Sequence, residues 1–103
     1  MKIWVDDIRE PPDYTWFWVK TSADAIQELI ISKMMFDGML GGICSYGLIT
    51  EMSLDHDLGG EDTTRPIVLW MCENEFWPVE VVVHSANPVG REWLEGMIER
   101  YKV

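Results

Sequence analysis

Carboxylates occur in two short groups, each directly after an apolar run. Asp6-Asp7 follow the run at residues 2–5, and Asp55-His56-Asp57 follow the run at residues 48–54. Clustered carboxylates repel one another, and one must take up a proton unless a cation lies among them. Their oxygens suit Mg²⁺ or Mn²⁺, whereas a histidine ligand would make Zn²⁺ or Fe²⁺ more plausible. The candidate metal ligands are Asp6, Asp7, Asp55 and Asp57, with an acidic structural turn cluster as the alternative.

The two histidines of the chain, His56 and His84, both follow apolar runs. Imidazole titrates near neutral pH, so either ring could act as a general acid beside a metal. A lone histidine more often lies at the surface or fills a hydrogen-bonding position, and this alternative stays open for both. The candidate catalytic residues are Asp55, His56 and His84.

The segment after His84 has the features of an anion site. Asn87-Pro88 predicts a helix start, where free backbone N–H groups bind anions. The candidate phosphate-binding residues are Arg9, Ser85, Asn87, Gly90 and Arg91. Gly90 would allow a close approach, and Arg91 adds a cation one turn into the helix. Two alternatives stay open: an ordinary capped helix with a solvent-facing arginine, and an Arg9 that simply pairs with Asp6 or Asp7.

Seven elements are needed to position these residues. Strands are expected at residues 2–6, 14–20, 48–54 and 79–83, and helices at 21–34, 65–76 and 88–101. A capping box begins the first helix at Thr21. Its inner face is expected to comprise Ile26, Leu29, Ile30 and Met34. Two prolines at 11–12 make that segment a loop, and the glycine-rich stretch 36–47 is expected to be a loop or an irregular insertion.

Strands separated by helices predict parallel pairing with right-handed crossovers. Ligands bind outside the carboxyl ends of the strands in an open parallel sheet. We therefore expect the three polar segments, which begin at Asp6, Asp55 and His84, to line one crevice.

The bulk composition limits the function classes. A length of 103 residues fits a single domain over residues 1–103. The net charge of −10 argues against broad nucleic-acid binding and against anionic membranes. The chain shows no signal peptide and no membrane-spanning run, so a cytoplasmic location is expected. The distant pair Cys44 and Cys72 is expected to be reduced and buried.

The spacing of these residues resembles two related families. Asp6-Asp7, Asp55 and Ser85 resemble the acidic pair, phosphoacceptor aspartate and Ser/Thr switch of response-regulator receiver domains. More specifically, the segments 5–9, 53–59 and 84–90 resemble the cyclic-phosphate processing receiver-like family.

The resemblance implies a three-layer receiver-like (flavodoxin-like) α/β fold with four parallel strands in the order 2-1-3-4. The proline loop replaces the first helix of a full receiver. The fifth strand is also missing, and with it the lysine that receivers use to hold the phosphoryl group. Lys102 comes too late, in a helix, to replace that lysine.

Residues and resemblance together predict a divalent-metal-dependent phosphoesterase-like protein. Its ligand would be a small cyclic phosphate, either an RNA terminus or a cyclic nucleotide. One alternative is a degenerate receiver with Asp55 as phosphoacceptor, which would need neither His56 nor His84. The other is a non-catalytic binder of a phosphorylated nucleotide. The sequence does not predict the oligomeric state.

Overall fold

Strands and helices follow one another in the expected order in the computed structural model, which describes residues 1–38 and 48–102. The elements are β1 (Lys2–Val5), β2 (Trp16–Val19), α1 (Ser22–Phe36), β3 (Glu51–Leu54), α2 (Arg65–Asn74), β4 (Glu80–Val83) and α3 (Pro88–Tyr101). The strands are shorter than expected, and α1 continues to Phe36. The expected glycine-rich loop lies outside the described residues from position 39 to position 47.

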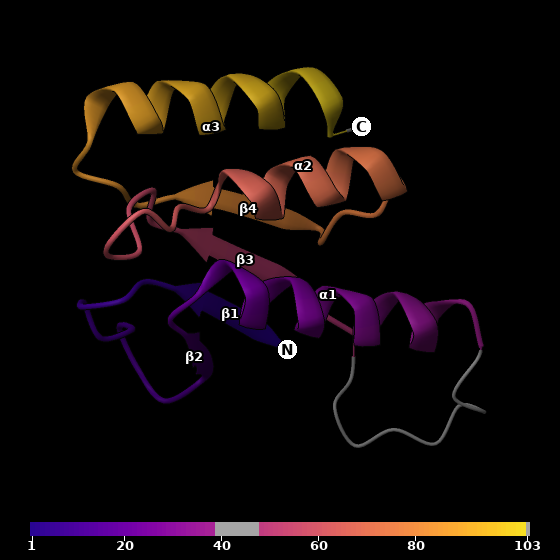
Figure 1. Ribbon diagram of the computed structural model, residues 1–103. Helices are drawn as coiled ribbons and strands as arrows, with labels where there is room; N and C mark the ends of the chain where they lie inside the picture. The colour runs from indigo at the N-terminus through magenta and orange to yellow at the C-terminus, as the bar shows by residue number, and fades with distance from the viewer. Residues whose placement is uncertain (39–47, 103) are drawn as a thin grey trace.

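All four strands are parallel and lie in the order β2-β1-β3-β4, which confirms the expected sheet. Figure 1 shows their arrowheads pointing to the same end of the molecule. Val5 is in register with Val19 on one side and with Leu54 on the other. Asp6 and Asp55, the next residues, therefore emerge side by side at the carboxyl end of the sheet.

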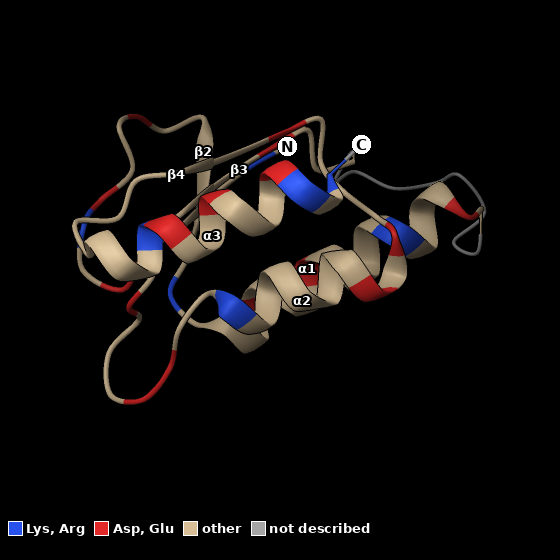
Figure 2. Cartoon of the chain, turned by 90° about the horizontal axis from the view of Figure 1, so that it is seen from above, with Lys and Arg blue, Asp and Glu red and all other residues tan. Residues whose placement is uncertain are grey.

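The hydrophobic core lies on one face of the sheet. Six strand residues that share this face are buried: Ile3, Val5, Val19, Met52, Leu54 and Val81. Their neighbours Trp4, Ser53 and Val82 point to the opposite face, because side chains alternate along a strand. Figure 2 shows α1, α2 and α3 on the same side of the sheet.

The described residues therefore form two layers, and the third layer of a flavodoxin-like sandwich is not among them. The reason lies in the connection from β1 to β2, which would carry a helix on the other face in a full receiver. Here Pro11 and Pro12 prevent helix formation in that connection. No strand follows β4 within residues 84–102.

Side-chain caps begin two of the helices near the carboxyl end of the sheet. The Thr21 hydroxyl accepts a hydrogen bond from the Asp24 N–H at 3.1 Å, as the capping box predicts. Asn87 Oδ1 accepts from the N–H groups of Val89 and Gly90, each at 3.1 Å. Both caps were expected from the sequence, and they fix where the functional segments meet the helices.

The three helices contain 15, 10 and 14 residues. Along the described chain, none is both long and apolar enough to cross a membrane. On α1 the buried stripe contains Ala25 and Leu29, whereas Ile30, expected inside, is 42 % exposed. Cys72 on α2 is half-buried, and Cys44 lies outside the described residues.

Candidate functional site

A pocket of about 370 Å³ opens at the carboxyl ends of β1, β3 and β4. It is lined by Asp6, Asp7, Ile8, Arg9, Asp55, Asp57, Gly59, Ser85, Ala86 and Asn87. The described lining thus contains four carboxylates and one cationic group, the guanidinium of Arg9. The three polar segments do converge, although four of the expected site residues lie outside this lining: His56, His84, Gly90 and Arg91.

Three carboxylates form a tight group within the pocket. One oxygen each from Asp6, Asp7 and Asp55 lies within 4.8 Å of the other two, so this cluster could hold a metal ion. Such a donor set of oxygens suits a hard divalent cation. Asp57, the fourth expected ligand, lines the same pocket but stands apart from the group.

Asp6 is the most constrained of the three carboxylates and is 1 % exposed. Its Oδ1 accepts hydrogen bonds from the N–H groups of Ile8 and Arg9, each at 2.9 Å. Burial by itself raises the pKa of Asp6, but these two bonds and the contact with His84 outweigh it and leave the pKa below its ordinary value. Asp6 is therefore ionised at neutral pH and suited to a cation.

Two glycines and hydrogen bonds to α1 fix the conformation of the loop after β3. Gly59 and Gly60 have φ of +87° and +58°. A Cβ on Gly59 would lie 3.0 Å from Asp7 Oδ2, so a glycine also allows Asp7 to approach. Asp62 accepts from the N–H and the hydroxyl of Ser22 at 2.9 and 2.5 Å. This loop is a tight turn tied to the start of α1.

Two hydrogen-bond donors, Ser85 and Arg9, line the same pocket as the carboxylates. Ser85 is 5 % exposed, and its Oγ accepts from the Asn87 N–H at 3.1 Å. Its own O–H proton remains free to be donated to a ligand. The Arg9 guanidinium donates to the carbonyl oxygen of His84 at 3.0 Å, which holds it at the pocket.

His84 lies behind Asp6, on the face of the sheet that carries no described helix. Its ring stacks on Trp4, with centroids 3.8 Å apart. Nδ1 is 2.7 Å from Ser53 Oγ, and Nε2 is 3.0 Å from Asp6 Oδ2. Burial lowers the pKa of His84 despite the opposing effect of Asp6. A neutral ring that accepts from Ser53 and donates to Asp6 satisfies both contacts.

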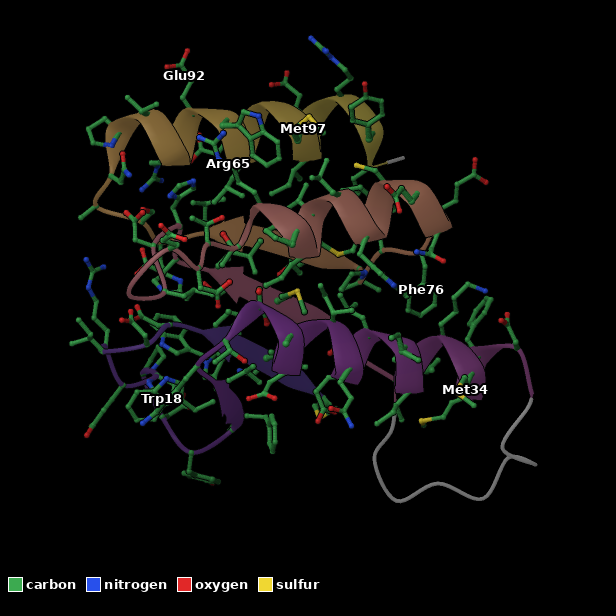
Figure 3. All side chains as sticks on the ribbon, in the orientation of Figure 1. Trp18, Met34, Arg65, Phe76, Glu92 and Met97 are labelled. Carbon is green, nitrogen blue, oxygen red and sulfur yellow. The ribbon has the colours of Figure 1, made fainter. Side chains whose placement is uncertain are left out.

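His56 lies buried in the loop after β3, beside the first residue of α2, and both of its ring nitrogens are also occupied. Arg65 Nε donates to His56 Nε2 at 2.9 Å, so Nδ1 carries the proton and donates to Asp57 Oδ1 at 3.0 Å. The Arg65 guanidinium also lies 4.7 Å from the centre of the Trp93 ring. Figure 3 shows Arg65 between α2 and α3. Sequence analysis did not identify Arg65, which has no motif around it.

The sequence model of the cyclic-phosphate processing receiver domain matches residues 1–100. The chain belongs to this family. Comparisons with curated proteins and with solved structures found no match. The match spans all three segments that suggested the resemblance, which is thereby confirmed.

In this cyclic-phosphate processing receiver domain, Gly90 makes room for His56 rather than for a ligand. A Cβ on Gly90 would lie 2.2 Å from the His56 ring, which is far too close. The Gly90 N–H already bonds to Asn87, so the start of α3 is capped from within. Arg91 does not line the pocket: its Nε donates to Glu95 at 2.7 Å, and a guanidinium N–H lies 3.5 Å from the Ser85 carbonyl oxygen.

Asp57 is anchored to this capped helix start. Its Oδ2 accepts from Asn87 Nδ2 at 3.0 Å, and Oδ1 accepts from His56. The hydrogen bond from Asn87, followed by that from His56, lowers the pKa of Asp57. The carboxylate lines the pocket in a fixed orientation. No described lysine lines this pocket.

Proposed function

We propose that the acidic pocket binds a divalent cation together with a cyclic phosphate and opens the phosphate ring by hydrolysis. One observation carries the proposal: the cluster of Asp6, Asp7 and Asp55 within 4.8 Å, in a pocket that also contains Ser85 and Arg9. Carboxylates alone would repel a phosphate, whereas a cation among them reverses the local field. The family description supports a cyclic phosphate as the substrate class.

The donor set favours Mg²⁺ or Mn²⁺ over Zn²⁺ or Fe²⁺. All three candidate ligands are carboxylates, and no histidine nitrogen lines the described pocket. Asp6, Asp7 and Asp55 would hold the ion. When bound, such an ion polarises phosphoryl oxygens and lowers the pKa of water.

The protein side chains bind and orient the reactants in this scheme. The Ser85 hydroxyl and the Arg9 guanidinium donate to non-bridging phosphate oxygens. Asp57 accepts a hydrogen bond from the attacking water and aims it at phosphorus. Because its pKa is lowered, Asp57 stays ionised and orients the water, and the proton that the attacking water loses passes to solvent.

We propose positioning roles for the two histidines, in place of the general-acid role expected from the sequence. His84 holds Asp6, and His56 holds Asp57, each through one ring nitrogen. The other ring nitrogen of each is occupied by Ser53 or Arg65. A solvent water at the open side of the pocket then donates the proton to the leaving oxygen.

The deciding experiment is incubation with Mg²⁺ or Mn²⁺ and a panel of 2′,3′-cyclic and 3′,5′-cyclic nucleotides, with products separated by chromatography. We expect ring opening that depends on the metal and is lost in Asp55→Asn. Asp37→Asn is the matched control, because Asp37 is exposed and pairs with Lys33 at the far end of α1. Equal loss in both variants would contradict the assignment.

A non-catalytic binder is the second candidate, favoured because no histidine is among the described residues that line the pocket. Calorimetric binding of a cyclic nucleotide with no product under any metal would establish it and exclude the hydrolase. Acid-labile labelling of Asp55 by acetyl phosphate would instead support a receiver with a phosphoacceptor.

We also propose that residues 1–103 form one domain and that the protein is cytoplasmic. The first statement predicts a single cooperative unfolding transition, measured by circular dichroism in urea. The second predicts recovery in the cytoplasmic fraction of the source cells.

A further inference from the structure

The outer edge of β4 carries backbone groups that face away from the sheet. The N–H groups of Glu80 and His84 donate toward the β3 side, at 3.1 and 2.9 Å. Because backbone groups alternate along a strand, the N–H and C=O groups of Val81 and Val83 point the other way. β4 is the last strand in the order, so no strand of the described chain pairs with this edge.

A groove of about 340 Å³ runs along this edge beside α3. The three valines of β4 form one side, and α3 forms the other through Arg91, Glu95, Ile98 and Glu99. It shares no lining residue with the acidic pocket. An edge strand beside a helix is the shape that receives an added strand, with main-chain hydrogen bonds on one side and side-chain contacts on the other.

The charges of the groove define what would fit. Arg91 is bonded to Glu95, and Glu99 adds a further negative charge to the α3 wall. Glu80 begins β4 at the same edge and is exposed. A segment with lysine or arginine side chains complements this surface, and an acidic segment is repelled.

We propose that β4 and α3 bind an extended, basic segment of a partner protein by strand addition. The backbone of this segment exchanges hydrogen bonds with Val81 and Val83. Its apolar side chains contact the valines and Ile98, and its basic side chains reach Glu95 and Glu99. This interaction goes beyond cyclic-phosphate chemistry and does not depend on it.

A second copy of the chain fits the edge less well. α3 packs on β4 in each copy, so pairing two β4 edges would bring two α3 helices into steric conflict at the interface. Each chain also carries a net charge of −10, which opposes association. These two features favour a partner of opposite charge without a helix over its strand.

The test uses the ¹⁵N-labelled full chain and a synthetic peptide of alternating lysine and valine, with an alternating glutamate and valine peptide as control. We expect the basic peptide to slow hydrogen exchange of the Val81 and Val83 amides by about tenfold or more, since these amides acquire acceptors. Failure of the basic peptide to bind would overturn the proposal. So would binding that leaves these two amides unprotected, or protection of a self-associated chain without peptide.

A pair of variants separates the groove from overall charge. Glu99→Lys should weaken binding of the basic peptide by roughly threefold to tenfold, the size expected for reversing one surface charge. Glu92→Lys makes the same charge change on α3, but Figure 3 shows Glu92 pointing away from the sheet. Equal weakening by both variants would mean non-specific attraction and would overturn the assignment.

Discussion

The carboxylates and the histidines both lie in segments that directly follow strands, yet the structure places them differently. Asp6, Asp7 and Asp55 face a common pocket, whereas His56 and His84 lie behind it. Each histidine connects a pocket carboxylate to the surrounding structure through both ring nitrogens. Polar residues at a strand end are thus divided between the pocket and the framework that holds it.

The largest effect is expected from Gly90→Ala. The added Cβ would overlap the His56 ring at 2.2 Å, so the variant should lose about 3 kcal/mol of unfolding free energy. Gly96→Ala is the control, because a Cβ there meets nothing within 4 Å and improves helix propensity. Urea denaturation measures both. An unchanged midpoint for Gly90→Ala would show that His56 is not fixed in place.

A smaller effect, on metal binding, is expected from His84→Gln. Removing a ring that orients a ligand should weaken Mn²⁺ affinity by about tenfold to a hundredfold, measured by calorimetry. A positioning role predicts this loss even without substrate. If Mn²⁺ affinity is retained while ring opening is lost, His84 is a general acid and the division between the two groups fails.

Asn87→Ala should cost about 1 kcal/mol of unfolding free energy, because the Val89 and Gly90 N–H groups lose their acceptor. Asn87→Ser keeps a capping oxygen but loses the donor to Asp57. We expect the serine variant to retain most of the stability and, like the alanine variant, to lose ring-opening activity. Full activity in the serine variant would contradict the role given to Asp57.

The smallest effect is a pH dependence of stability in the metal-free protein. Burial lowers the pKa of folded His84, so the unfolded chain takes up a proton first, near pH 6.5. The contribution of neutral, buried His84 to the free energy of unfolding is therefore complete above this pH. It is lost as the pH falls through the lower pKa of the folded state. Urea midpoints should therefore fall on acidification. His84→Gln should flatten this part of the profile, and an unchanged slope would exclude His84 as its source.

Much of the fold could be predicted because its signals are local. Short apolar runs end in polar residues, and Thr21 and Asn87 are good caps for reasons contained within three neighbouring residues. Alternation of strands and helices then restricts the sheet to parallel pairing. Parallel pairing in turn predicts that Asp6 and Asp55 lie beside each other at the carboxyl end of the sheet.

The remaining features depend on tertiary contacts. Arg65 contacts His56 because the tertiary structure brings the start of α2 next to the loop after β3. No local sequence pattern predicts this contact. Gly90 looks like a phosphate contact from its position, but the His56 ring fills that space. The helix missing between β1 and β2 of the described chain is an exception, because Pro11 and Pro12 already exclude it in the sequence.

The sheet order also dictates when the acidic pocket can form during synthesis of the chain. β1 is a central strand, yet its second neighbour, β3, begins at Glu51. At about 5–20 residues per second, the first strand waits several seconds for that partner. The pocket needs Asp55 and then Ser85, so a nascent chain stalled before β4 contains the carboxylates without the complete site.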